Sequence, residues 1–97
     1  MNDRSEYRIR LGRHLRSYRE GRALAQRDVV RLVPHAIRRQ ATLSYYEAGL
    51  REVPLFVADE LARLYGVRLD VLVALPFTAA RAAGKVAKRW QIDGLPV

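Results

Sequence analysis

The chain contains no cysteine among its 97 residues. This absence excludes disulfide bridges, thiolate zinc sites and thiol nucleophiles, and it is compatible with a reducing cytoplasm. The sequence also lacks any apolar run of about 18 residues, so it predicts no membrane-spanning helix. Residues 1–6 are polar and charged, so we expect no secretory signal and a cytoplasmic location.

Acidic residues are scarce relative to basic ones. The chain has 10 acidic and 18 basic residues, a net charge of +8, and 16 of the basic residues are arginine. Residues 1–51 alone carry 12 arginines against 5 acidic residues. Such a basic half is typical of proteins that bind a polyanion, most often nucleic acid and sometimes an anionic membrane. Arginine also serves simply as a solubilising cation, so charge alone leaves both interpretations open.

Apolar residues recur at three- and four-residue spacing between the prolines and glycines that punctuate the chain. This pattern predicts an all-α fold, since no stretch shows sustained strand alternation. The predicted helices cover residues 6–20, 26–33, 39–48, 54–65 and 69–75. The fourth is expected to carry Pro54 at its first position, where a missing N–H costs nothing. Residues 6–75 would form one domain and residues 76–97 a C-terminal extension.

The extension contains an apolar stripe of small residues that ends in Trp90. The stripe predicts a sixth, amphipathic helix. It could complete the core of the domain, or it could form a homodimer interface through Ala83, Val86 and Trp90, because small residues allow close approach and tryptophan is a good anchor. A membrane-surface helix fits less well, because alanine offers little apolar area.

Several short motifs occur along the chain in a fixed order. They are Leu11-Gly12, Leu24-Ala25-Gln26, the run from Leu43 to Gly49, Pro54, and the run from Leu61 to Val67. With these motifs, residues 11–75 resemble the phage repressor/Cro family of helix-turn-helix DNA-binding domains, the XRE family. The resemblance implies that the second helix crosses the phosphate backbone and the third enters the major groove. It further implies a sequence-specific transcriptional regulator of double-stranded DNA. We expect a homodimer and, by default, a repressor, because a bound dimer can block polymerase without additional parts; an activator is the alternative.

The resemblance also assigns roles to individual residues. Base reading falls to the outward side of the third helix: Arg39, Gln40, Ala41, Ser44 and Tyr45. Phosphate binding falls to Gln26, Arg38, Thr42 and Arg51. Arg19 and Glu47 would form a structural ion pair that ties the reading helix to the first helix. Glutamine and arginine suit this work because they can make paired hydrogen bonds to adenine and guanine, respectively.

The chain departs from the family pattern between the second and third helices. Residues 34–38 replace a tight glycine turn and lengthen the connection, which changes the expected register of the reading helix. We expect Ile37 to fill the core from this turn, and His35 and Arg38 to reach towards DNA. Ala25 stands where the family has a capping serine, which removes a bond that typically contributes about 1 kcal/mol.

No feature of the sequence predicts an enzyme or a cofactor. His14 and His35 are far apart in sequence without a third ligand at metal-binding spacing, and Asp59 and Glu60 are adjacent, so they point in different directions on a helix. RNA binding is also disfavoured, because no aromatic platform is evident. The alternative function is a protein-interaction adaptor or antitoxin-like module in which DNA binding is secondary.

Overall fold

The computed structural model describes residues 3–74, and within this range the chain is entirely helical. The helices are α1 (Asp3–Gly21), α2 (Gln26–Leu32), α3 (Gln40–Ala48), α4 (Leu55–Tyr65) and α5 (Leu69–Val73). The prediction of an all-α, five-helix domain is confirmed. The predicted sixth helix, with Ala83, Val86 and Trp90, lies outside the described residues. None of the described helices is long and apolar enough to cross a membrane.

Helix ends follow the local chemistry of the chain. Gly49 and Gly66 close α3 and α4 with positive φ angles of 76° and 74°, a conformation that glycine adopts without a steric penalty. The expected position of Pro54 is wrong by one residue. Its ψ angle of 150° is extended, so Pro54 precedes α4 as the N-cap, and its carbonyl accepts the backbone N–H groups of Val57 and Ala58.

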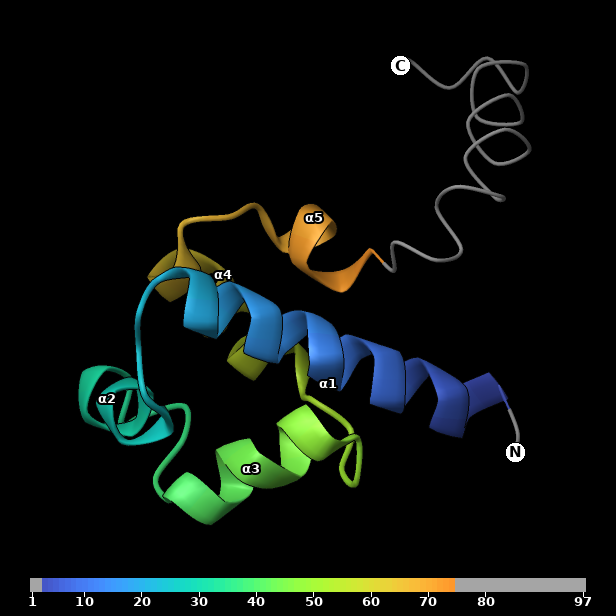
Figure 1. The fold of residues 1–97 in the computed structure, drawn as a ribbon, viewed down its shortest axis with the longest axis horizontal. Helices are drawn as coiled ribbons and strands as arrows, with labels where there is room; N and C mark the ends of the chain where they lie inside the picture. Colours follow the sequence, from blue (N-terminus) through green and yellow to red (C-terminus); the bar gives the residue numbers. More distant parts are fainter. Residues whose placement is uncertain (1–2, 75–97) are drawn as a thin grey trace.

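Helix α1 runs through the middle of the domain, with α3 on one side and α5 on the other (Figure 1). Every described helix contributes to one apolar core. Its fully buried side chains include Leu15, Val29, Leu43, Leu61 and Leu72. The arrangement leaves α3 at an outer edge of the described domain (Figure 1).

Gly12 sets how closely α1 and α3 approach one another. A Cβ atom at this position would lie 2.4 Å from the carbonyl oxygen of Glu47 and 2.6 Å from that of Tyr46. Any larger residue would therefore push against the backbone of α3. The contact places α1 directly against the backbone of the C-terminal half of α3.

Candidate nucleic-acid interface

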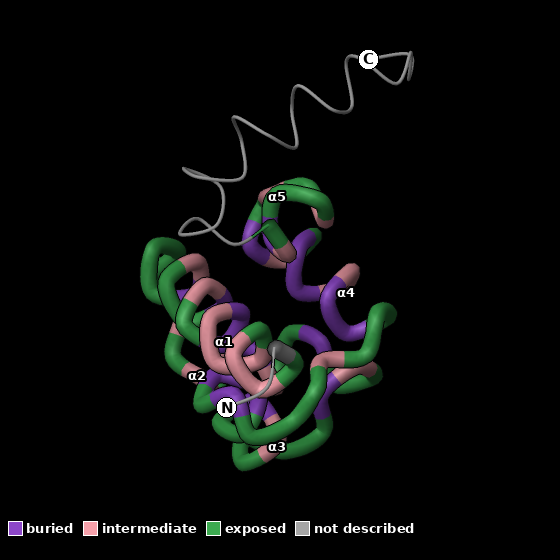
Figure 2. Tube along the Cα trace, turned by 90° about the vertical axis from the view of Figure 1, so that its right-hand side faces the viewer, coloured by how far each residue is buried: buried purple, intermediate pink, exposed green. Residues whose placement is uncertain are grey.

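Helix α3 has one buried side and one exposed side. Leu43, Tyr46 and Glu47 face the interior. The exposed residues are Gln40, Ala41, Ser44, Tyr45 and Ala48, while Thr42 is half-buried. Their spacing of one and four residues places the exposed set on one face of the helix. Figure 2 shows α3 at the rim of the described domain, with exposed residues along it. The four predicted base-reading residues of α3 therefore share a solvent-facing surface.

The connection between α2 and α3 is held to the core at its centre. Ile37 is completely buried, as expected, and its backbone N–H donates to the carbonyl of Val33 at 3.0 Å. Arg38 and Arg39 follow it and are exposed. His35 lies 3.2 Å from a carboxylate oxygen of Glu60, Nε2 to Oε2, so in this structure it contacts α4.

Arg19 and Glu47 form a buried, bidentate ion pair, and this pair confirms no more than their contact. Arg19 Nε lies 2.7 Å from Glu47 Oε2, and Arg19 Nη2 lies 3.0 Å from Glu47 Oε1. A third nitrogen of the guanidinium, Nη1, donates to the carbonyl of Leu24 at 2.7 Å. The hydrogen bonds to Glu47, and after them the negative charge of Glu47, raise the pKa of Arg19 above its ordinary value. The pair joins the end of α1, the loop before α2 and the last turn of α3.

Two glutamines extend this network to the protein surface. Gln26 Nε2 donates to Glu47 Oε1 at 3.0 Å, and Gln40 Nε2 donates to Gln26 Oε1 at 3.3 Å. A carboxylate can only accept hydrogen bonds, so Glu47 fixes the orientation of the Gln26 amide and leaves its oxygen for Gln40. The first residue of α3 is thereby connected to a buried ion pair through the first residue of α2.

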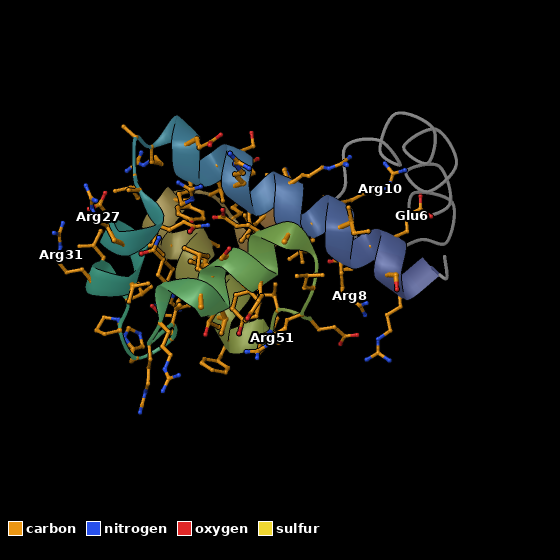
Figure 3. The ribbon with its side chains drawn as sticks, turned by 60° about the horizontal axis from the view of Figure 1, so that its bottom comes forward. Glu6, Arg8, Arg10, Arg27, Arg31 and Arg51 are labelled. Atoms are coloured by element: carbon orange, nitrogen blue, oxygen red, sulfur yellow. The ribbon has the colours of Figure 1, made fainter. Side chains whose placement is uncertain are left out.

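Arginines without an acidic partner gather around α2 and α3. Of the 14 arginines in residues 3–74, eight lie within 4.0 Å of a carboxylate oxygen. Within this part of the chain, the other six have no such partner: Arg13, Arg22, Arg27, Arg38, Arg39 and Arg51. Four of these six, Arg27, Arg38, Arg39 and Arg51, lie on or next to the two helices. Figure 3 shows Arg27 on α2 and Arg51 on the segment that follows α3. Guanidinium groups that are not neutralised are available to bind an anion.

Arg51 makes one further contact that the sequence pattern does not predict. Its guanidinium carbon lies 4.8 Å from the centre of the Tyr45 ring. Tyr45 is 41% exposed and belongs to the outward side of α3. The predicted phosphate-binding residue is therefore in contact with a predicted base-reading residue.

The chemistry of the described residues does not assemble a metal site. No group of three or more histidine, aspartate or glutamate side chains among residues 3–74 is placed to hold an ion. The buried hydroxyl of Tyr65 lacks a hydrogen-bond partner in this range, and burial raises its pKa. The outward surface of α3 is thus the strongest candidate site in the described domain.

The comparison with protein families agrees with this geometry. A family model described as a helix-turn-helix domain matches residues 10–75, about two thirds of the chain. The match contains α2, the connection, α3 and both following helices. Searches of curated proteins and of solved structures found no match. By the extent of this match, the chain belongs to the helix-turn-helix domain family.

Proposed function

We propose that this protein is a cytoplasmic transcriptional regulator that recognises a specific sequence in double-stranded DNA. Membership of the helix-turn-helix family points to a DNA-binding regulator. The observation that carries the finer proposal is the outward side of α3, which is exposed and is flanked by arginines that have no carboxylate partner in the part of the chain that the structure describes. The major groove is about 12 Å wide and admits one helix of this kind. In this proposal α3 enters the groove, as in the XRE family.

Base reading centres on the first half of α3. Gln40 uses one N–H of its amide on Gln26, which leaves its carbonyl oxygen and a second N–H. These two groups match the donor and acceptor that adenine presents in the major groove. Arg39 is suited to guanine, Ala41 to the methyl group of thymine, and Ser44 to either kind of base. The bond that Gln40 donates to Gln26 would hold Gln40 in place before DNA arrives, which reduces the entropy lost on binding.

Phosphate binding is proposed for residues at both ends of α3. Arg38 precedes the helix, Thr42 lies in its first half, and Arg51 follows it. Gln26 is the fourth member, because one of its amide N–H groups is not used by Glu47. Contacts of this kind position a protein on the duplex without selecting a sequence, and each one makes binding more sensitive to salt.

The regulator is further proposed to be a repressor that binds as a homodimer. A bound dimer can block transcription without additional parts. Two-fold symmetry would place the half-sites about 34–36 Å apart, or at a multiple of this distance. The candidate interface is the stripe with Ala83, Val86 and Trp90, which lies outside the described residues.

A protein-interaction module is the second candidate, and one surface favours it. A groove between α1, α4 and α5 is lined by apolar side chains and by four charged ones, Arg4, Arg8, Arg51 and Glu52. Leu55, one of its apolar lining residues, is 72% exposed, and the adjacent Phe56 is 60% exposed. Adjacent exposed apolar residues of this size often mark a protein contact.

Selection from a pool of random duplexes, at two salt concentrations, tests the main proposal. The wild-type protein is expected to enrich one sequence. Gln40→Ala is expected to lose its preference at one position, where a good paired contact discriminates by about 1–3 kcal/mol. Arg63→Ala is the control, since this exposed arginine lies on α4 and already pairs with Asp59; it should select the wild-type sequence. Absence of enrichment, or an unchanged sequence for Gln40→Ala, contradicts base reading by α3.

A further inference from the structure

We infer that Tyr45 is a positioning residue that holds the guanidinium of Arg51 in place to bind a DNA phosphate. This inference rests on the proposed function and deepens it. It assigns Tyr45 a role different from base reading, and it treats Tyr45 and Arg51 as one unit at the C-terminal end of α3.

The turn after α3 brings the two side chains together. Gly49 has a φ angle of 76°, and the backbone N–H of Leu50 donates to the carbonyl of Tyr45 at 2.9 Å. The chain therefore folds back over the last turn of the helix. Arg51 emerges beside Tyr45 as a result, with its guanidinium carbon 4.8 Å from the ring centre.

Helix α1 supports this turn from the inside. A Cβ atom at Gly49 would lie 2.6 Å from Cα of Ile9, so the turn packs directly against the α1 backbone. Arg8 Nε also donates to the carbonyl of Gly49 at 3.3 Å. These two contacts hold the backbone next to Arg51 against α1, the same helix that packs against α3.

The neighbouring acidic residue does not neutralise Arg51. Glu52 forms an ion pair with Arg4, and Arg8 Nη1 lies 3.8 Å from the same carboxylate. The hydrogen bond from Arg4 comes first among the causes that lower the pKa of the Glu52 carboxyl, and the charges of Arg4 and Arg8 add to it, so the carboxylate stays ionised and engaged at neutral pH. Among residues 3–74, Arg51 itself has no carboxylate within 4.0 Å, and its charge is available to a phosphate.

A guanidinium that stacks on an aromatic ring can still donate its N–H groups to a phosphate. The five N–H groups of arginine lie in the plane of the guanidinium, so a guanidinium that lies flat over an aromatic ring, as we infer for Arg51 over Tyr45, keeps them at its free edge. The edge can therefore make paired hydrogen bonds to a phosphate while the ring limits the motion of the side chain. The same contact covers part of the Tyr45 ring, which reduces the surface that it could offer to a base.

A double-variant cycle tests the inference. Affinity would be measured over a series of KCl concentrations for wild type, Tyr45→Phe, Tyr45→Leu, Arg51→Ala and the double variant Tyr45→Leu/Arg51→Ala. Two probes are needed: the duplex selected by the wild-type protein and a scrambled duplex of equal length. Circular dichroism and urea denaturation would check that each variant folds, which is expected because both side chains are exposed.

The expected results separate a positioning role from base reading. Tyr45→Phe keeps the ring and should bind both duplexes like wild type. Tyr45→Leu should weaken binding to both by about two- to fivefold, the size of a cation–aromatic contact at an exposed site. Arg51→Ala should lower the slope of log affinity against log salt by about 1. In the Arg51→Ala background, Tyr45→Leu should have no further effect.

Two outcomes overturn the inference. Additive losses in the double variant would show that the residues act independently. A changed sequence preference for Tyr45→Phe would show that the hydroxyl reads a base. Both differ from failure of the proposed function, in which the wild-type protein itself binds the selected and scrambled duplexes equally.

Discussion

Replacing Glu47 with glutamine is the most informative perturbation of the scaffold, because it removes one charge from the buried ion pair with little change in volume. The side chains of Glu47 and Arg19 are only 4% and 9% exposed, and two hydrogen bonds of 2.7 and 3.0 Å join them. Glu47→Gln leaves the guanidinium of Arg19 buried without a compensating charge. It should also weaken the connection through Gln26 to Gln40.

The size of this effect follows from burial. Removing one partner of a buried, hydrogen-bonded pair costs about 3–5 kcal/mol. The 72 described residues, at about 0.05–0.15 kcal/mol per residue, would have a total stability of about 4–11 kcal/mol. Glu47→Gln should therefore remove a large share of the free energy of unfolding. Glu20→Gln is the matched control, since the Arg16–Glu20 pair is more than half exposed and should contribute at most about 1 kcal/mol.

Urea denaturation followed by far-ultraviolet circular dichroism measures both variants. The double variant Arg19→Met/Glu47→Leu should recover most of the loss, because replacing both members of a buried pair with apolar residues is often neutral. A change below about 1 kcal/mol for Glu47→Gln, equal to that for Glu20→Gln, would refute the reasoning from burial.

Two further predictions concern helix packing and assembly. Gly12→Ala should destabilise the domain and weaken binding to all duplexes, because the added Cβ would lie within 2.6 Å of two α3 carbonyl oxygens. Gly21→Ala is the control, since no atom lies within 4 Å of its Cβ position. Equal midpoints of urea unfolding for the two variants would contradict the close approach of α1 and α3. Truncation after residue 75 should yield a monomer by sedimentation and weaken binding to a two-half-site duplex more than to a single half-site; a truncated protein that still dimerises would place the interface within residues 1–75.

The sequence predicted the helices well because each depends on local information. Apolar spacing located all five, and glycine marked the ends of α3 and α4. The burial of Ile37 was also predictable, since it is the largest apolar residue of the connection and such residues usually enter the core. Helix α1 begins three residues earlier than expected, where Arg4 contacts Glu52 of a distant loop. Such a contact cannot be seen from helical periodicity.

The interior of the candidate site was less predictable. The bonds that link Gln26 to Glu47 and Gln40 depend on how α2 and α3 cross, and the close approach at Gly12 depends on how α1 and α3 cross. His35 contacts Glu60 because the longer connection passes over α4, which no local pattern indicates. The stacking of Arg51 on Tyr45 depends on the turn at Gly49, so only the three-dimensional structure relates these two residues.

The central claim is that the outward side of α3 contacts DNA, and nuclear magnetic resonance tests it most directly. The isotopically labelled protein would be titrated with the duplex that it selects, and the shifts of backbone and side-chain signals would be mapped onto the structure. We predict the largest shifts at residues 38–45 and at Arg51, with small shifts in α5. Because Arg51 also lines the groove between α1, α4 and α5, residues 38–45 distinguish the two surfaces. Shifts concentrated along the groove, with residues 38–45 unchanged, would contradict the claim.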